Sequence, residues 1–228
     1  MKRYLKIYLL PLLSLLFVML SCIHEYPSDD TNIQQVKVYF SYQNFYDISS
    51  DDDFEDIKRI DLFVFDEYGN FVDRWIDDNA PQLDSSYYME IPLAYGNYQI
   101  ISWMGFSDSY NITPSTFENQ TTFEECMLSL KRSEDGIVNH IPSRLLYAAE
   151  RHAVIDAPNV NFKLRLQQLS NTIKITTEGL KPSDTPYGLA VKDNNGDYLF
   201  DGLLAPNNKR LEYKITCQKD EHHQPFAS

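Results

Sequence analysis

The feature that most constrains the fold is a series of short segments in which apolar and polar residues alternate. Residues 36–40 (VKVYF) and 160–166 (VNFKLRL) alternate strictly, which is typical of a strand with one apolar face. Residues 60–65 (IDLFVF) are apolar at every position after Asp61, as expected for a central strand that is buried on both faces. These segments predict an all-β fold.

Turn-forming residues separate the predicted strands. Residues 66–70 (DEYGN) join two extended runs and predict a hairpin over residues 60–76. A second hairpin-like unit is predicted where residues 94–97 (AYGN) join two further strand-like runs. Residues 193–197 (DNNGD) contain Asn-Gly, the strongest short hairpin signal, and are also interpreted as a hairpin turn.

The strands are predicted to form two antiparallel β-sandwich domains. A boundary is placed near Asp156 to Asn159, where Ala-Pro-Asn interrupts the strand pattern. The first domain is then expected over residues 35–156. The second is expected over residues 157–228 and is small enough to look incomplete. Residues 144–151 (RLLYAAER) fit a short helix and a strand almost equally well.

The N-terminus resembles a bacterial secretion signal. Basic residues precede a 14-residue apolar stretch, residues 7–20, which is shorter than a membrane-spanning helix needs to be. The stretch ends in Met-Leu-Ser-Cys (residues 19–22), which is similar to the lipobox of bacterial lipoproteins, in which the cysteine is acylated and becomes the new N-terminus. Residues 1–21 are therefore predicted to be a signal peptide, Cys22 the lipid attachment site and residues 22–34 a tether. The alternative is an ordinary cleaved signal that leaves Cys22 as a thiol.

The charge balance excludes one class of partner. The chain has 33 acidic and 20 basic side chains, a net charge of −13, and removal of the three basic residues of the signal peptide would leave −16. A generic nucleic-acid binder needs a basic face, so no nucleic-acid partner is expected. Anionic lipid headgroups would repel such a body, which should stand off the membrane on its tether. Ser28-Asp29-Asp30 is similar to the acidic signal that sends some lipoproteins to the outer surface, with an acidic linker as the alternative.

No constellation of catalytic or metal-binding residues is recognisable. The sequence lacks nucleophile-elbow, zinc-protease and phosphate-loop motifs, so no enzyme activity, catalytic residue or cofactor is predicted. The acidic residues 51–56 lack the spacing of an EF-hand loop, and His222-His223 supply only two of the four ligands of a typical metal site, so no metal is predicted. Cys126 and Cys217 are predicted to be free thiols, with a disulfide between them as the alternative.

Several segments in a fixed order resemble the FimB-type fimbrillin anchor lipoproteins of Bacteroidales. They are the lipobox Cys22, residues 59–66 (RIDLFVFD) followed by Gly69, and residues 93–98 (LAYGNY) followed by Trp103 and Gly105. Residues 162–180 resemble the opening of that family's second domain. The resemblance implies two transthyretin-like β-sandwich domains. Because family members usually run longer than this chain, a C-terminal truncation of the second domain is part of the expectation.

The resemblance also implies a non-enzymatic function. Members of this family anchor type V fimbriae to the outer membrane, so the expected partners are fimbrial shaft or accessory subunits. The membrane itself would hold the acyl chains, such as palmitate, of Cys22. The expected location is the cell outer membrane, exposed at the surface, as part of a fimbrium that serves cell adhesion. Contact with subunits is expected through β-strand complementation, in which a strand of one chain pairs with a backbone edge of another.

Val36, Val38 and Phe40 are the candidate residues for strand exchange. In this family, shaft subunits are understood to expose a groove after a protease cuts past an Arg near the N-terminus. Between Cys22 and Lys58 this chain has no Arg. The first strand is therefore expected to stay in place and to fill its own groove, which suits a chain that ends a polymer at the membrane.

The alternative function is that of a surface lipoprotein that binds glycan. Trp75, Trp103 and the 16 Tyr of the chain supply rings that stack on sugars, and a β-sandwich would present them on loops. Trp103, however, lies within a strand-like run, where a core position is expected.

Overall fold

The structure, a computed structural model, is all-β in the residues that it describes. These are residues 32–42, 59–79, 86–106, 108–140, 142–171, 173, 175–176, 188–216, 218–219 and 225–227. Within them, the one named helical element is the short 3₁₀ turn η3 (Phe123–Glu125). No helix in this part of the chain has the length and apolar character needed to cross a membrane. The all-β prediction is confirmed.

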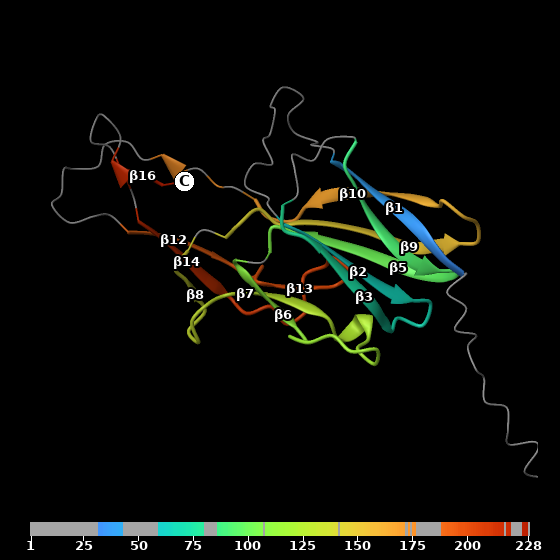
Figure 1. Cartoon of the computed structure of the whole chain (residues 1–228). Coiled ribbons are helices and arrows are strands. Elements are labelled where there is room, and N and C mark those ends of the chain that lie inside the picture. The colour runs from blue at the N-terminus through green and yellow to red at the C-terminus, as the bar shows by residue number, and fades with distance from the viewer. Residues whose placement is uncertain are drawn as a thin grey trace, which may run out of the picture. The chain divides into compact units, whose positions relative to one another are not determined.

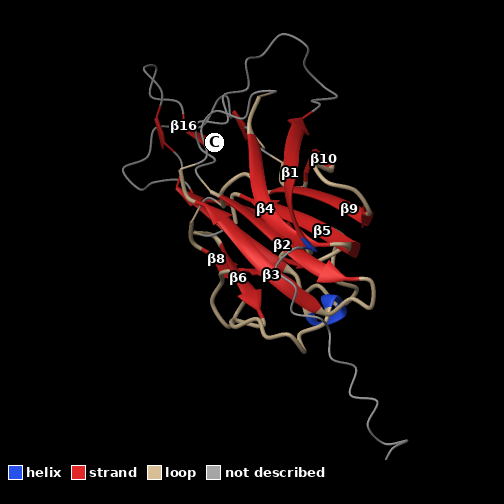
Figure 2. Ribbon diagram, turned by 45° about the vertical axis from the view of Figure 1, so that its right-hand side comes forward, coloured by secondary structure: helices blue, strands red, loops and turns tan. Residues whose placement is uncertain are grey.

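The largest sheet has seven strands in the order β3-β2-β5-β9-β10-β1-β4, and Figures 1 and 2 show its strands side by side. In chain order, its strands are β1 (Ile33–Tyr42), β2 (Ile60–Asp66), β3 (Phe71–Asp77), β4 (Tyr88–Ala94), β5 (Gly96–Met104), β9 (Leu146–Ile155) and β10 (Asn161–Gln168). Most of its neighbours run antiparallel, but β1 and β10 are parallel.

Three smaller sheets have three strands each. The first has the order β13-β7-β6, the second β12-β14-β8 and the third β11-β16-β15. Their strands are β6 (Tyr110–Thr113), β7 (Met127–Leu130), β8 (Ile137–Val138), β11 (Ile175–Thr176), β12 (Gly188–Asp193), β13 (Asp197–Leu199), β14 (Leu211–Thr216), β15 (Gln218–Lys219) and β16 (Pro225–Ala227).

The seven-stranded sheet encloses a first core on one of its faces. This core is made of inward-facing residues from six of its strands, and Trp75 of β3 packs against it. Alternation produces it: in β4, the buried residues Met89, Ile91 and Leu93 alternate with exposed ones. The buried members of the first core are Val36, Val38, Phe40, Ile60, Leu62, Val64, Met89, Ile91, Leu93, Ile100, Met104, Leu146, Ala148, Ala153, Ile155, Leu164 and Leu166.

A second core covers the opposite face of β2, β5 and β9. Phe63 and Trp103 project into it from β2 and β5, so these strands are buried on both sides. Its other members come from β2, β5 and β9 themselves, from two of the smaller sheets and from turns. They are Phe65, Ile101, Phe106, Tyr110, Cys126, Leu128, Leu130, Val138, Leu145, Tyr147, Tyr198, Phe200 and Leu211. The interpretation of residues 60–65 as a central strand is confirmed.

The predicted turns have mixed outcomes. The hairpin over residues 60–76 is confirmed, because β2 and β3 pair through a turn in which the Asp66 carboxylate accepts hydrogen bonds from the backbone N–H groups of Tyr68 and Asn70. The second hairpin-like unit is wrong in its pairing. Its two strands form as β4 and β5, but β4 lies beside β1 whereas β5 lies between β2 and β9.

The hairpin predicted at residues 193–197 is also wrong. β12 pairs with β14, whereas β13 pairs with β7, so the Asn-Gly turn carries the chain from one sheet to another. The buried Asp197 explains the change of direction. Its carboxylate accepts two hydrogen bonds of 2.8 Å from Arg132, and its backbone N–H donates to the side chain of Asn208. Side-chain partners distant in sequence thus override the local turn preference.

Strands from both sides of the predicted domain boundary share sheets. The boundary near Asp156 to Asn159 falls between β9 and β10, which are neighbours in the seven-stranded sheet. β13 and β14 likewise pair with β7 and β8. Residues 34–228 fall in one compact unit. β10, β13 and β14 pair with strands that precede the predicted boundary, whereas β11, β15 and β16 form a sheet of their own.

Two local features fix how β9 meets β5. Residues 144–151, which fit a helix or a strand, contribute to β9, because Leu146 and Ala148 enter the first core while Tyr147 enters the second. Gly105 follows β5 with a φ of +77°, and a Cβ atom there would lie 1.9 Å from the backbone oxygen of Arg144. Only glycine fits this close approach of two backbones.

Candidate partner-binding strand

The candidate strand-exchange residues lie on the inner face of β1. Val36 and Val38 are fully buried and Phe40 is 4% exposed. The Phe40 ring lies 5.8 Å from that of Tyr87, which flanks the start of β4. The predicted inward face of this strand is confirmed. Its role in strand exchange stays a prediction.

Both backbone edges of β1 are occupied. The strand lies between β10 and β4 in the sheet. Its parallel register with β10 places Val38 beside Phe162 and Phe40 beside Leu164, and the Lys37 N–H donates to the Val160 carbonyl at 3.3 Å. Removing β1 would leave an apolar groove and two unpaired backbone edges, which is the acceptor geometry of β-strand addition. With β1 present, this groove is filled by the chain itself.

A hydrogen bond links the two ends of the seven-stranded sheet. β3 and β4 are its edge strands. The Tyr87 hydroxyl donates to the carboxylate of Asp77 at 2.7 Å, so the end of β3 is tied to the start of β4. Burial and this carboxylate both raise the pKa of Tyr87, which keeps the hydroxyl protonated as a donor.

A buried carboxylate lies on the second-core face of β2. Asp61 is fully buried and accepts hydrogen bonds from Arg59 (2.8 Å, Nε to Oδ2) and Arg74 (2.9 Å, Nε to Oδ1). The hydrogen bond to Asp61 raises the pKa of Arg59. The Arg74 guanidinium also lies 4.8 Å from the centre of the Phe63 ring. This cluster has a structural role, since both cations are satisfied by the one carboxylate.

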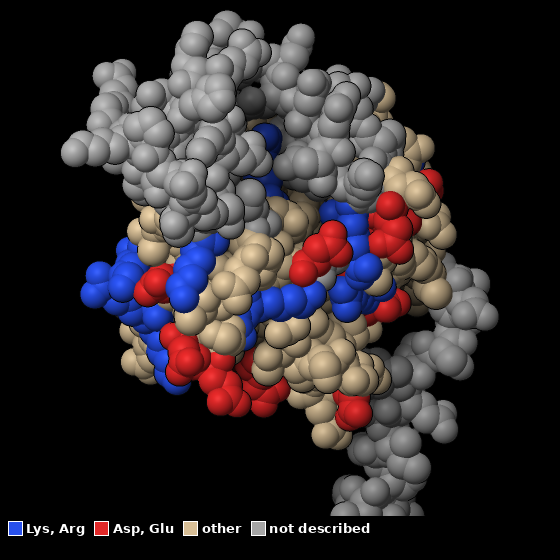
Figure 3. Space-filling view, turned by 90° about the vertical axis from the view of Figure 1, so that its left-hand side faces the viewer, with Lys and Arg blue, Asp and Glu red and all other residues tan. Residues whose placement is uncertain are grey.

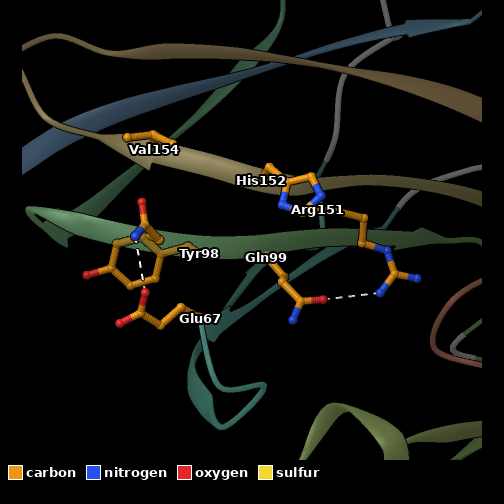
Figure 4. Close-up of a pocket in the computed structure, with 7 residues that line it drawn as sticks. Glu67, Tyr98, Gln99, Arg151, His152 and Val154 are labelled. Carbon is orange, nitrogen blue, oxygen red and sulfur yellow. Dashed lines mark hydrogen bonds between the residues drawn. The ribbon is translucent and has the colours of Figure 1, made fainter.

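A surface hollow of about 360 Å³ lies on β5 and β9 near the β2–β3 turn. Figure 4 shows its side chains: Tyr98 and Gln99 project from β5, and His152 and Val154 from β9. Asn97 donates to Glu67 at 3.1 Å and Arg151 donates to Gln99 at 3.2 Å. The hollow therefore has polar walls whose groups are largely bonded to one another. Its residues are distant in sequence, and no local motif signals them.

The two tryptophans do not form an exposed sugar-binding surface. Trp103 is fully buried in the second core, with its ring 4.8 Å from that of Tyr147. Trp75 is partly buried and packs against the first core. The core position expected for Trp103 is confirmed.

The remaining predicted site residues have different outcomes. Cys22 and most of the tether, the acidic residues 51–56, His222-His223 and Cys217 lie outside the described residues. Cys126 is a free, buried thiol, as predicted, and burial raises its pKa to about 12. No group of three or more potential metal ligands occurs in the part of the chain that the structure describes.

Charged side chains of both signs are intermixed on the face shown in Figure 3. The charged side chains seen there form no large area of one sign, so they favour no single class of charged partner. Lys192 and Glu212 form an ion pair of 2.9 Å across the paired strands β12 and β14.

Comparison with known proteins identifies a family for the sequence and similar solved structures for the fold. The family model of fimbrillin-A associated anchor proteins Mfa1 and Mfa2 matches residues 27–224. Curated proteins give no match to the sequence. The fimbrial anchor protein Mfa2 from Porphyromonas gingivalis has a TM-score of 0.67 at 21% identity, and the match covers 86% of this chain and 71% of that one.

Two further solved structures have the same fold. A Bacteroides thetaiotaomicron protein described as a candidate polysaccharide-binding protein gives a TM-score of 0.68 at 21% identity, over 85% of this chain and 69% of that one. A candidate adhesin from Bacteroides ovatus gives 0.65 at 15% identity, over 86% and 67%. Identities this low show a shared fold. The family match, in contrast, extends over most of the sequence, and by that match the chain belongs to the family of fimbrillin-A associated anchor proteins Mfa1 and Mfa2.

Proposed function

We propose that this protein is a FimB-type outer-membrane lipoprotein that anchors a type V fimbria at the cell surface. In this proposal, residues 1–21 are a signal peptide, and the acylated Cys22 and the tether to residue 34 hold the folded body to the membrane. The family match carries the proposal, and the lipobox-like end of the apolar stretch supports the lipid attachment.

Fimbrial shaft or accessory subunits are the proposed partners, bound through β-strand complementation. The retained β1 supports a terminal position in the polymer, because its apolar residues fill the groove and its two edges are paired by β10 and β4. We propose that the seven-stranded sheet and the elements packed on its second-core face form a transthyretin-like sandwich. A subunit would have to pair with an edge that the fold leaves open, such as β3 or β4 at the ends of the large sheet.

The lipid attachment is tested in a deletion strain of the native host that is complemented with variants of the full chain. We expect the unaltered chain to incorporate labelled palmitate and to keep fimbriae on the cells. Cys22→Ala should lose the label and shed fimbriae into the medium, whereas Cys217→Ser, a cysteine change far from the lipobox, should behave as the unaltered chain. Fimbriae that stay on cells carrying Cys22→Ala would contradict anchoring through this cysteine.

The strand complementation is tested by hydrogen exchange on a complex of the chain with its fimbrial subunit. Pairing with an incoming strand should slow exchange at alternate backbone amides along one edge strand, because only the N–H groups that point outward gain partners. A complex in which no strand amide gains protection would exclude this mode of contact while leaving the lipid anchor in place.

A further inference from the structure

The outer face of β10, β1 and β4 carries a compact group of basic and aromatic side chains. We call it the basic tyrosine face, and it consists of Lys37 and Tyr39 of β1, Tyr88 of β4, and Lys163 and Arg165 of β10. Figure 2 shows the three strands side by side. These residues alternate with the inward residues of the first core, so they point away from it.

Contacts between strands hold this group together. Tyr39 and Tyr88 have ring centres 5.3 Å apart with their planes inclined by 44°, and the Lys37 ammonium lies 4.6 Å from the centre of the Tyr88 ring. The parallel register places Tyr39 beside Lys163 and Ser41 beside Arg165. From β10 to β4, the face therefore presents two cations, then a lysine and a tyrosine of β1, and then the second tyrosine.

The charge of this face is opposite to that of the chain. The face has three cations and one outward carboxylate, Glu90 of β4, while the whole chain has a net charge of −13. Lys163, Arg165 and Glu90 are exposed, and Tyr88 is 39% exposed. Cations gathered on one face of an acidic protein favour an anionic ligand at that face.

Recognition at the centre of this face depends on side chains. β1 and β10 are each paired on both sides, so a ligand that lies over them meets no free strand edge, and the open edge of β4 lies at the margin of the face. Flat tyrosine rings present π faces to C–H groups, and lysine and arginine bind carboxylates through charge-assisted hydrogen bonds. A sugar ring that carries a carboxylate offers both kinds of group at once. We propose that the basic tyrosine face binds an acidic glycan, a polysaccharide rich in uronic acids.

Other anionic partners fit this face less well. Nucleic acid requires many phosphate contacts, and three cations on a chain of net charge −13 are too few. An anionic membrane would be repelled by the rest of the body, and the two tyrosines pack against each other and do not protrude as an insertion element. An acidic peptide would use the cations but would gain little from the paired rings.

The test measures binding of the full-length chain in detergent to immobilised alginate, a polyuronate. Neutral dextran, polyglutamate and vesicles of anionic phospholipid are the comparison ligands. Lys163→Ser with Arg165→Ser removes two exposed cations, and Tyr88→Ser removes a ring on an edge strand. Lys209→Ser with Arg210→Ser removes two exposed cations elsewhere and is the matched control. Unfolding midpoints verify that each variant is folded.

We expect binding to alginate that exceeds binding to dextran and polyglutamate. The double variant on β10 and the Tyr88 variant should each weaken it about tenfold or more, while the control should change it less than about twofold. Absence of alginate binding, equal binding to polyglutamate or to anionic vesicles, or an equal loss in the control would each overturn the proposal. None of these results depends on Cys22 or on fimbrial subunits, so anchoring is tested separately.

Discussion

The two cores that cover opposite faces of β2, β5 and β9 are built from different materials. Of the 17 buried residues of the first core, Phe40 is the one aromatic residue, whereas eight of the 15 in the second core are aromatic. The first core is filled by strands of one sheet, in which small and branched side chains meet at regular spacing. The second combines residues of β2, β5 and β9 with others from short strands and turns, where large rings span irregular distances.

This difference indicates that the two cores have different structural roles. The aliphatic core fixes β1 in its groove, on which the proposed anchoring depends. The aromatic core attaches two of the smaller sheets, β13-β7-β6 and β12-β14-β8, and its members come from segments as far apart as Phe63 and Phe200. We therefore expect the first core to be the more stable part, and the second layer to open at a lower free energy.

Truncation at the centre of the second core is the strongest test of this difference. The Phe200 ring lies 5.0 Å from that of Phe63 and 6.1 Å from that of Trp103. Phe200→Ala should lower the free energy of unfolding by about 4 kcal/mol, because it leaves a cavity among rings that cannot collapse. Hydrogen exchange should show protection lost in β6, β7 and β13 and retained in β1 and β10.

The matched variant lies in the first core. Leu164 of β10 is 1% exposed, and Leu164→Ala should cost about 3 kcal/mol and reduce protection throughout the seven-stranded sheet. If both variants unfold the whole chain in one transition with the same exchange pattern, the two cores are a single cooperative unit and the proposed difference in stability is wrong.

The second-core face of β2 also carries the buried carboxylate of Asp61. Removing its charge should have the next largest effect on stability. Asp61→Asn keeps the shape of the side chain but removes the buried carboxylate shared by the guanidiniums of Arg59 and Arg74, which are 29% and 22% exposed. We expect a loss of about 3 kcal/mol in the free energy of unfolding, measured with urea.

Asp78 is the control for this variant. It lies 3.2 Å from the same Arg59 but its side chain is 65% exposed, so Asp78→Asn should cost less than about 1 kcal/mol. Equal effects of the two variants would show that burial does not distinguish the two carboxylates.

The first core could be predicted from sequence to a greater extent than the second. Strict alternation gave the inward positions Val36, Val38 and Phe40, and the doubly apolar run of β2 indicated a strand between two layers. A period of two is a local property, so it survives in the sequence. The aromatic core follows this period only in part, as at Phe63 and Phe65 of β2, because Tyr110, Cys126 and Phe200 come from turns and short strands with no shared pattern.

Which strands become neighbours is a tertiary property and was not predictable here. Residues 94–97 and 193–197 have good turn chemistry, yet both carry the chain between non-adjacent strands. The domain boundary was placed at a local break, while β10 continues the sheet beyond it. The basic tyrosine face was missed for the same reason. Lys37 and Lys163 were visible in alternating segments, but only the parallel pairing of β1 with β10 brings them to one surface.

The smallest predicted effect concerns the one polar side chain inside the aliphatic layer. Ser102 lies between Leu62 and Ala148 in the register of β2, β5 and β9, is fully buried, and its hydroxyl has no hydrogen-bond partner among the described residues. An unpaired buried hydroxyl costs free energy, and alanine removes it with little loss of volume. Ser102→Ala should therefore raise the free energy of unfolding by about 1 kcal/mol.

Ser109, whose hydroxyl accepts the Ser143 N–H at 2.9 Å, is the control, because Ser109→Ala leaves that donor unpaired and should destabilise the fold. A Ser102→Ala chain less stable than the unaltered one would mean that the first core depends on a polar contact. The two cores would then differ only in their number of aromatic rings.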